Sequence, residues 1–262
     1  MKVAWDTLIK RAEALRAQRG EVAELLAFYA RLLGAQKQVY EAICGRLNWL
    51  PSGSLAQDLD DIRPAWGTLL EAVAASGPAP LADEARRLRQ ASADDLDELL
   101  LQYWHAPADT QFFAKAFLQP YASRLAELGR RPVDRNLESG ESRCTFCAGK
   151  PQLALLKVQE VGGDGGSRHL LCSTCLSVWT FRRVVCAHCG EERPAKLAYF
   201  HAPEFAHLRV ESCDTCGHYI KGVDLTRLGV AAPLVDEVAA AALDLWAREH
   251  GYTKIELNLV GI

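Results

Sequence analysis

The chain has 262 residues, of which 49% are hydrophobic and 24% are charged, and its formal net charge is −3 at pH 7. These values are typical of a globular protein and exclude a strongly basic polyanion-binding chain and a disordered acidic one. No apolar run approaches the roughly 20 residues that span a bilayer and the charged N-terminus is unlike a secretory signal, so we expect a cytoplasmic protein with no membrane insertion.

Residues 1–135 are predicted to form an α-helical bundle. Apolar residues recur every three or four positions between residues 22 and 43, which indicates one long helix with a single apolar face. Breakers at residues 51–54 and 77–80 separate this helix from the elements that follow. We expect about five or six helices in this region.

Two further helix starts are visible before residue 135. Ser92 precedes Asp94 and Asp95, and an acidic first turn suits the helix dipole. Asp109 is a candidate N-cap for the next helix, which we expect to end near Gly129.

Residues 140–226 have a different texture, with short strand-like runs at 153–158, 178–181 and 208–210. The glycine run at 162–166 lacks the Lys-Ser/Thr pair of a phosphate-binding loop, so we interpret it as a hairpin tip. Residues 230–262 are predicted to form one C-terminal helix, ending near His250, and a tail.

Eight of the nine cysteines form four Cys-x-x-Cys pairs in residues 140–226. The pairs are Cys144/Cys147, Cys172/Cys175, Cys186/Cys189 and Cys213/Cys216. Two sulfurs three residues apart on a tight turn can face one tetrahedral ion, and two such turns complete its shell. Because cytoplasmic cysteines stay reduced, we expect two metal sites rather than four disulfides.

The spacing of the pairs indicates an internal duplication. The first pair recurs after 42 residues and the second after 41, and the loops inside the two units contain 24 and 23 residues. We therefore predict two units, at about 143–183 and 184–226, each with its own four-cysteine site. The rival arrangement, in which the two middle pairs meet, would leave the outermost pairs to each other.

Each predicted site has a complete shell of four thiolates. No position is open for water or substrate, so the ion would be structural and would hold together a ribbon with a small core. Iron and zinc both accept such a site, and the sequence does not separate them. Gly190 and Gly217, directly after two of the pairs, suit the left-handed turn that such knuckles often need.

Other side chains near the pairs have alternative interpretations. The histidines that flank the pairs could replace a cysteine as ligand; they are His169, His201, His207 and His218. His188 lies inside a knuckle and is expected at the surface. Cys44, on the apolar face of the long helix, is predicted to be a small buried hydrophobe.

Several segments of residues 144–262 resemble, in order, the formate dehydrogenase accessory proteins, the FdhE family. The matching segments are the four cysteine pairs, the run from Cys172 to Cys189 through Trp179 and Arg183, the run from Glu211 to Lys221, and the tail from Pro233 to Leu259. The first knuckle, Cys144-Thr-Phe-Cys147-Ala148-Gly149, departs from the Cys-Pro-x-Cys-Gly usual in the family.

The resemblance implies an α+β fold with an N-terminal α-helical bundle, two tandem rubredoxin-like (zinc-ribbon-like) modules and a C-terminal helix. It also implies a cytoplasmic accessory protein or chaperone that binds the catalytic subunit of a respiratory formate dehydrogenase during maturation and is not an enzyme. Iron is the metal expected from the family, and zinc also fits.

We hypothesise that the two ribbons fix the geometry of a docking surface between the bundle and the metal-binding region. The candidate partner-binding or supporting residues, close in sequence to the knuckles, are Arg183, Glu211, Asp214, Tyr219 and Lys221. Self-association of the chain stays open.

Two other function classes compete with this interpretation. A nucleic-acid-binding zinc ribbon could stack bases with Arg182 and Arg183 beside Trp179, but residues 141–225 contain ten Lys and Arg against nine Asp and Glu, a poor balance for phosphate binding. A rubredoxin-like iron site could instead transfer electrons. An enzyme has no support, because we find no Ser/His/Asp set, no open metal shell and no nucleotide loop.

Overall fold

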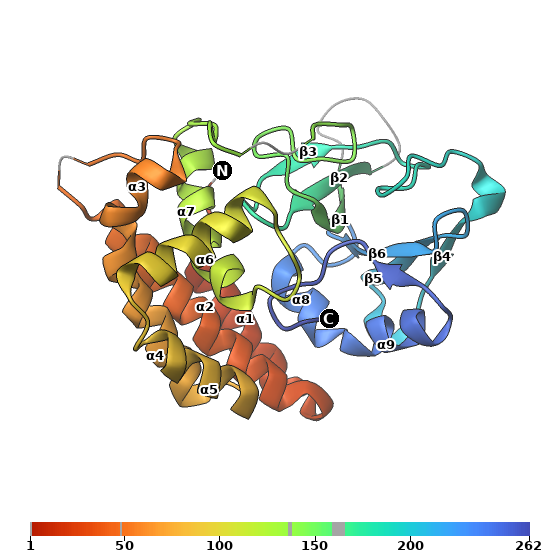
Figure 1. The fold of residues 1–262 in the computed structure, drawn as a ribbon. Helices are drawn as coiled ribbons and strands as arrows, with labels where there is room; N and C mark the ends of the chain where they lie inside the picture. Colours follow the sequence, from red (N-terminus) through yellow and green to blue (C-terminus); the bar gives the residue numbers. More distant parts are fainter. Residues whose placement is uncertain (1, 48, 136–137, 159–165) are drawn as a thin grey trace.

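The computed structural model describes residues 2–47, 49–135, 138–158 and 166–262. Within this part of the chain, helices occupy the N-terminal half, and a mixed sheet with two shorter helices occupies the C-terminal half (Figure 1). The predicted α+β fold, with helices first, cysteine-rich strands next and helix again at the end, is confirmed.

Seven α-helices lie in the described residues before position 128, slightly more than expected. They are α1 (Trp5–Gln18), α2 (Ala23–Cys44), α3 (Leu55–Ile62), α4 (Trp66–Ser76), α5 (Ala79–Leu88), α6 (Ala93–His105) and α7 (Phe112–Glu127). The predicted long helix is α2, and its apolar face is buried at Leu26, Leu33, Val39 and Ile43. The predicted breakers separate α2 from α3 and α4 from α5.

The two predicted helix starts had different outcomes. Ser92 caps α6: its hydroxyl accepts from the Asp95 amide, and the Asp95 carboxylate accepts from the Ser92 amide. This capping box confirms the first prediction. The prediction at Asp109 was wrong, because α7 begins at Phe112 and its N-cap position, Gln111, makes no side-chain cap. Burial of the α7 apolar face, including Phe117, supports this helix without a cap.

The strands form one mixed sheet. In the described residues they are β1 (Pro151–Lys157), β2 (Ser167–Cys172), β3 (Val178–Thr180), β4 (Leu197–Phe200), β5 (Leu208–Cys213), β6 (His218–Asp224) and β7 (Thr253–Lys254). Their order is β3-β2-β1-β6-β5-β4, and β7 pairs with β6. The glycine run predicted as a hairpin tip lies mostly in residues 159–165, outside the described residues, between the antiparallel strands β1 and β2.

The sheet contains the same topology twice, which agrees with the predicted duplication. In the first unit β2 pairs antiparallel with β1 and β3, and in the second unit β5 pairs antiparallel with β4 and β6. The first strand of one unit, β1, then pairs parallel with the last strand of the other, β6. The units are therefore joined by backbone pairing between residues 68 positions apart, such as Leu155 and Val223.

The C-terminal helix is broken into two, unlike the single helix that was predicted. Helix α8 (Pro233–Ala239) ends and α9 (Ala241–Glu249) begins around Ala240, whose φ of −103° and ψ of 40° are not helical. The Glu237 carbonyl accepts from the Ala240 amide at 3.2 Å and from the Lys221 ammonium at 2.6 Å. Because this carbonyl points at a side chain of β6, the regular helical ladder stops there.

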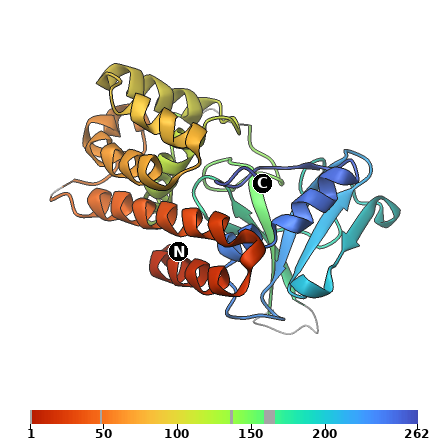
Figure 2. The same cartoon turned by 90° about the horizontal axis from the view of Figure 1, so that it is seen from below.

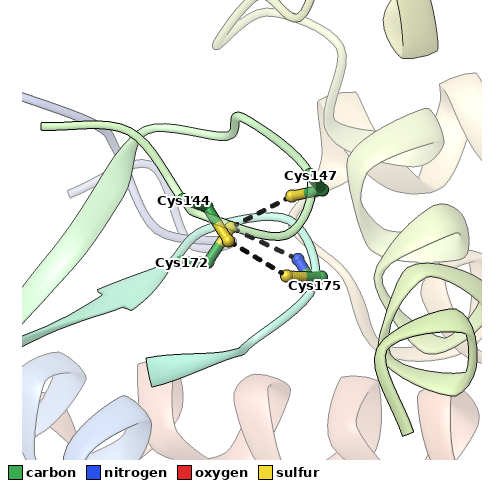
Figure 3. Close-up of side chains that lie close together, drawn as sticks. All are labelled: Cys144, Cys147, Cys172 and Cys175. Carbon is green, nitrogen blue, oxygen red and sulfur yellow. Dashed lines mark hydrogen bonds between the residues drawn. The ribbon is translucent and has the colours of Figure 1, made fainter. Parts of the chain in front are cut away.

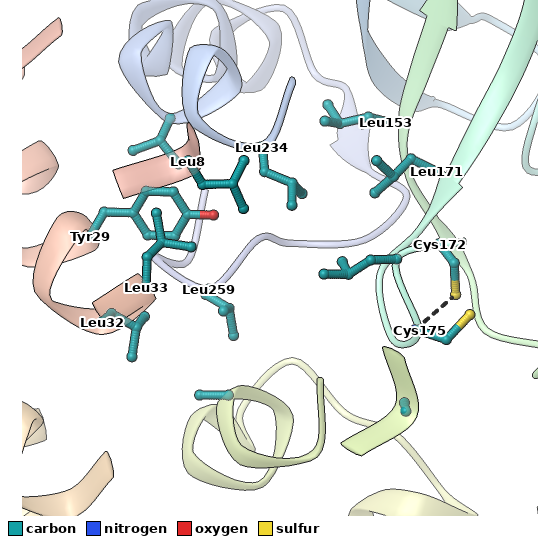
Figure 4. Packing of buried hydrophobic residues seen from close by; sticks show 14 of the residues in the cluster. Leu8, Tyr29, Leu32, Leu33, Leu153, Leu171, Cys172, Cys175, Leu234 and Leu259 are labelled. Atoms are coloured by element: carbon teal, nitrogen blue, oxygen red, sulfur yellow. Dashed lines mark hydrogen bonds between the residues drawn. The ribbon is translucent and has the colours of Figure 1, made fainter. Parts of the chain in front are cut away.

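Bundle and sheet share a continuous apolar core. Leu8 of α1 and Tyr29 of α2 lie on the helical side, Leu153 of β1 lies on the strand side, and Leu234 and Leu259 lie between them (Figure 4). Burying one such leucine contributes about 1.5–3 kcal/mol. This packing holds the sheet against the helices.

An ion-pair cluster also joins the two halves, at the point where α1 lies beside the C-terminal segment (Figure 2). Arg11 of α1 donates to both carboxylate oxygens of Asp236, at 3.0 and 2.6 Å, and His207 lies 2.9 Å from the same carboxylate. Burial works to raise the pKa of Asp236, but the hydrogen bonds from His207 and Arg11 bring it below its ordinary value. Asp236 is thus charged and fully paired.

The predicted division into residues 1–135, 140–226 and 230–262 stays a prediction, since one core extends over all three ranges. None of the helices in the described residues has the length and apolar character that crossing a membrane requires.

Candidate metal centres

The four Cys-x-x-Cys pairs lie at equivalent places in the two units. The first pair of each unit precedes the unit's first strand, and the second pair connects its last two strands. Antiparallel pairing sets Pro151 opposite Cys172 in the first unit and Leu197 opposite Cys213 in the second. Strand register therefore brings the first pair of each unit to the second pair of the same unit.

In three of the four pairs, a backbone amide points at the first sulfur of the knuckle. The Phe146, Thr174 and His188 amides lie 3.4, 3.3 and 3.4 Å from the sulfurs of Cys144, Cys172 and Cys186. Such contacts favour the thiolate form of the cysteine. Three of the four knuckles thus share this arrangement of donors among the described residues.

The residue after each knuckle is left-handed in all four cases. Gly190 and Gly217 have φ of 77° and 66°, as we expected because both residues are glycines. Ala148 and Leu176 have φ of 57° and 58°, which the sequence analysis did not foresee because neither is a glycine. A left-handed residue with a side chain is strained by roughly 1–2 kcal/mol, so the knuckles hold these two positions against their preference.

The sulfurs gather in two groups of four, with the pairing predicted from the duplication. The first group is Cys144, Cys147, Cys172 and Cys175, and the second group is Cys186, Cys189, Cys213 and Cys216. Within each group all sulfurs lie within 4.8 Å of one another. The rival pairing of the two middle pairs was wrong.

The distances between the sulfurs fit a shared metal ion. Sulfurs from different Cys-x-x-Cys pairs of the first group are 3.6 Å (Cys144 to Cys175) and 3.5 Å (Cys147 to Cys172) apart, and the equivalent two distances in the second group are both 3.8 Å. A tetrahedron with metal–sulfur bonds of about 2.3 Å has edges of about 3.8 Å, whereas a disulfide would need about 2.05 Å. All these cysteines are free thiols. Each group could therefore hold one metal ion.

The first group is buried, and helices lie beside it (Figure 3). Gln119 of α7 donates to the Ser173 carbonyl at 2.7 Å and so ties this knuckle to the bundle. A Cβ added at Gly149 would lie only 2.8 Å from the Cys172 sulfur, so the chain passes close to the group where only glycine fits. Burial raises the pKa of the Cys172 thiol, and a cation in the group would restore the thiolate.

The second group lies closer to solvent. Cys189 is exposed and Cys216 is half-buried, although burial still raises the pKa of the Cys216 thiol. The rings of His188 and His218 stack at 3.8 Å beside it, and each has a nitrogen within 4.8 Å of the Cys216 sulfur. As predicted, His188 is exposed.

The remaining predicted side chains are placed as follows. Among the described residues, His218 lies beside a cysteine group, whereas His169, His201 and His207 belong to no cluster that could hold a metal ion. Cys44 is exposed at the last position of α2, so its predicted burial was wrong: the helix ends there, and the apolar face of α2 is buried only as far as Ile43.

The candidate partner-binding residues differ in their exposure to solvent. Arg183 and Asp214 are exposed. Glu211 is buried, pairs with Arg168 at 2.7 Å, and accepts from Arg209 at 2.6 Å. Because Arg168 also donates to the Val185 carbonyl next to the second group, Glu211 supports the contact between the two units.

Tyr219 and Lys221 are fully buried and belong to a charge network. Lys221 pairs with Asp244 of α9, and Tyr219 donates to Asp244 at 2.8 Å. Lys254 lies 3.1 Å from Asp244 and also pairs with Glu237. Burial first, and then Lys254, lowers the pKa of Lys221 to about 8. These two residues can support a docking surface but do not reach one.

A groove of about 660 Å³, which the sequence analysis missed, lies between the end of α1, β4 and its following loop, and α9. The rings of Phe200 and Trp246 line it 4.4 Å apart. At its edge Arg19 donates to the Glu204 carbonyl at 2.8 Å. Trp246 of α9 is half-buried and lines this groove.

Comparison with known proteins gives one consistent set of relatives. The family model described as FdhE, C-terminal domain, matches residues 184–260. A protein FdhE homolog of Aquifex aeolicus is 32% identical over 58% of this chain, and an Edwardsiella ictaluri homolog is 29% identical over 95% of it. Protein FdhE of Escherichia coli is 30% identical over 74% of it.

The matched lengths of these relatives differ. The alignments cover 52% of the Aquifex protein, 86% of the Edwardsiella protein and 64% of the Escherichia protein, so the chain spans less than two thirds of two of them. The crystal structure of the FdhE protein from Pseudomonas aeruginosa has the same fold, with a TM-score of 0.71 over 99% of this chain and 97% of that one, at 23% identity.

Proposed function

Because the chain belongs to the FdhE family, we propose that it is an accessory protein for a formate dehydrogenase and not itself an enzyme. In this role it binds the catalytic subunit of a respiratory formate dehydrogenase in the cytoplasm during maturation. The observation that carries the proposal is the pair of closed four-cysteine groups, which offer a rigid frame and no position for a substrate.

We propose that each cysteine group binds one iron or zinc ion. The ligands would be the two Cys-x-x-Cys pairs of each unit, since their sulfur spacing suits a tetrahedral shell. A bound ion would cross-link strands and knuckles of a unit that buries little apolar surface of its own. Protein purified without added metal should contain two ions per chain by elemental analysis.

The groove at Phe200 and Trp246 is the docking surface that we propose for the client. Its lining comes from the bundle through Arg19, from the second unit and from α9, so its shape depends on the junction that the metal-binding units help to form. Aromatic side chains in a partly apolar groove are typical anchors for a protein segment. The occupant would be an apolar segment of the catalytic subunit.

Affinity purification from the native host tests both parts of this proposal. The tagged chain should retain a formate dehydrogenase catalytic subunit, identified by mass spectrometry. Trp246→Ala should reduce its recovery by about tenfold or more, as expected for an aromatic anchor. Trp49→Ala is the matched control, because Trp49 is also half-buried but lies in the loop after α2, outside the groove.

The two parts can fail separately. If no subunit of a molybdenum or tungsten enzyme is bound by the wild-type chain, the accessory role is wrong. If Trp246→Ala retains the subunit as well as the wild type does, the role stands and the docking surface lies elsewhere.

Electron transfer is a second candidate function, favoured by the exposure of Cys189 in the second group. An iron ion near the surface could exchange electrons with a partner, and hydrogen bonds and exposure would set its potential. A reversible one-electron couple at a physiological potential would support this function. A colourless protein that contains only zinc would eliminate it.

A further inference from the structure

Strand β4 is the last strand at one end of the sheet, and in the described residues it pairs only with β5 (Figure 1). The Asp214 amide donates to the Lys196 carbonyl at 2.9 Å, so the pair just before β4 is hydrogen-bonded. Hydrogen-bonded and non-hydrogen-bonded pairs alternate along antiparallel strands, and the pair of Tyr199 with Glu211 is therefore of the second kind. The amide and carbonyl of Tyr199 thus point away from β5.

This outer edge of β4 is free to make further hydrogen bonds. Within the described ranges, neither the amide nor the carbonyl of Tyr199 has a hydrogen-bond partner. The residue is 40% exposed, so a partner can approach the edge from solvent. A free strand edge of this kind is a template for pairing with another extended segment.

The equivalent edge of the first unit is occupied by a parallel strand. Ala154 of β1 is the equivalent of Tyr199, because the residues opposite them, Leu170 and Glu211, each lie two positions before the first cysteine of a knuckle. On this side β1 takes β6 as a parallel neighbour, with Gly222 opposite Ala154. The fold of one unit therefore accepts a parallel strand at this edge, and in the second unit no strand of the described chain lies there.

The groove at Phe200 and Trp246 lies along the same edge. Tyr199, Phe200 and His201 are among the residues that line it, and the Phe200 ring lies 4.4 Å from that of Trp246 in α9. Residues side by side on paired strands point to the same face of a sheet. A side chain opposite Phe200 on an added strand would therefore point toward Trp246.

The opposite face of the edge is positively charged. Successive residues of a strand alternate between faces, so Tyr199 points away from the side of Phe200. Its hydroxyl donates to the carbonyl of Arg183 at 3.2 Å. Arg183 and Lys196 are both exposed, and neither forms an ion pair with a carboxylate in the part of the chain that the structure describes.

We propose that an extended segment of the catalytic subunit adds to the free edge of β4 as a further, parallel strand. This inference rests on the docking surface proposed above and adds the form and chemistry of the segment that it takes. Apolar side chains of the segment enter the groove beside Phe200 and Trp246, and the alternate, acidic side chains face Arg183. Main-chain hydrogen bonds then supply affinity, and the alternating side chains supply specificity.

A second copy of this chain cannot repeat the junction between β1 and β6. The β6 residues in that junction are Lys221–Asp224. Counted from the last cysteine before each strand, their equivalents in the first unit are residues 180–183, but β3 ends at Thr180. The other free edge of the sheet is therefore too short to be the partner of β4, and we assign the edge to a segment of another protein.

Tyr199→Pro, compared with Tyr199→Ala, tests strand addition. Both variants lose the phenol ring, but only proline removes the outward amide, and pairing with β5 does not use that amide. The tagged Tyr199→Pro chain should retain about tenfold less catalytic subunit, purified from the native host, than Tyr199→Ala does. Metal content and melting temperature should be the same in both.

Charge reversal tests the acidic side chains of the segment. Arg183→Glu should retain several-fold less catalytic subunit than Arg87→Glu, since Arg87 is an equally exposed arginine on α5, away from the sheet. If the two variants retain the subunit equally well, the acidic character assigned to the segment is wrong.

Hydrogen exchange of the wild type covers the case in which Tyr199→Pro does not fold. In the complex with the catalytic subunit, the Tyr199 amide should exchange about tenfold or more slowly than in the free chain, because it gains a hydrogen bond. The Ala198 amide, which faces β5, is the internal control and should change less.

The outcomes separate this inference from the proposed function. If the wild type retains no catalytic subunit, the accessory role is wrong and strand addition falls with it. If the subunit is retained, but Tyr199→Pro matches Tyr199→Ala and the Tyr199 amide keeps its exchange rate, strand addition alone is overturned. A wild-type dimer in sedimentation that Tyr199→Pro dissociates would make a second copy the occupant and overturn the assignment to the catalytic subunit.

Discussion

The two cysteine groups have the same ligands, spacing and strand topology, but their surroundings differ. Every cysteine of the first group is at most 4% exposed, whereas Cys189 of the second group is exposed and Cys216 is half-buried. Neighbouring sulfurs from different Cys-x-x-Cys pairs are slightly closer in the first group, at 3.5 and 3.6 Å, than in the second, at 3.8 Å.

The difference arises from what packs on each unit. Helix α7 reaches the first group through Gln119 and the Ser173 carbonyl. Beside the second group, Tyr252 of the C-terminal segment donates to the exposed Asp214. A duplicated motif can thus produce two sites with identical donors and unequal access to water, because the outer contacts of a site belong to the tertiary structure.

The largest expected effect on stability comes from removing one metal ligand, in either the first or the second group. Cys172→Ser should lower the free energy of unfolding by about 5 kcal/mol or more, since it leaves buried thiols without an ion in the shared core. Cys213→Ser should cost less, because its group is partly solvated. Chemical denaturation measures the free energy of unfolding of each variant, and elemental analysis should find one ion per chain in each. Equal losses would mean that burial does not distinguish the groups.

Removal of Lys221 tests whether the second unit depends on the buried charge network as well as on its ion. Lys221→Met leaves Asp244 with fewer partners, and breaking a buried pair costs about 3–5 kcal/mol. Lys196→Met, an exposed substitution in the same unit, should have little effect. Both are compared by urea unfolding at pH 7, and a neutral Lys221→Met would contradict the assigned network.

Lys221→Met should also change how the free energy of unfolding depends on pH. The pKa of Lys221 is lowered from 10.5 to about 8 in the folded chain, so between these values the unfolded chain binds more protons. Through this group alone, stability therefore rises with pH across that window. The slope contributed by Lys221 should vanish in Lys221→Met.

The close approach of the chain to the first group should make Gly149 sensitive to substitution. In Gly149→Ala the new Cβ would meet the Cys172 sulfur at 2.8 Å and the Thr174 hydroxyl at 2.9 Å. We expect a loss of about 2–3 kcal/mol and weaker metal retention in the first group. Gly140→Ala is the control, because nothing lies within 4 Å of its Cβ. Similar melting temperatures for both variants would argue against this crowding.

The two groups should also release their ions at different rates, because they differ in exposure to solvent. With a coloured chelator in excess, the ion of the second group should leave about ten times faster or more, a difference of about 1.4 kcal/mol in barrier height. Cys213→Ser and Cys172→Ser, each with a single ion, assign the two phases. A single release rate would make the difference in exposure irrelevant to exchange.

The smallest effect concerns equivalent left-handed positions of the two units. Ala148→Gly should stabilise the chain by up to about 1 kcal/mol, and Gly190→Ala should destabilise it by about 1 kcal/mol, because only glycine adopts positive φ without strain. Thermal unfolding of both variants measures the pair. Shifts of the same sign would contradict the strain assigned to Ala148.

Predictions from the sequence succeeded where a short segment decided the outcome. The periodicity of α2, the helix start at Ser92 and the left-handed glycines after two knuckles depend on neighbours a few residues apart. The grouping of the cysteines was also predicted correctly, because the repeated spacing gives each unit its own set of four cysteines. The failures at Asp109 and Cys44 concern positions where helix packing, not local pattern, decides.

The sequence by itself determined the helical first half, the duplicated cysteine units and which four sulfurs meet, since spacing and periodicity act over short stretches of chain. Only the tertiary structure decided the parallel pairing of β1 with β6, the break at Ala240 and the unequal burial of the two groups. These features depend on contacts between residues far apart in the chain, and such contacts leave no local pattern.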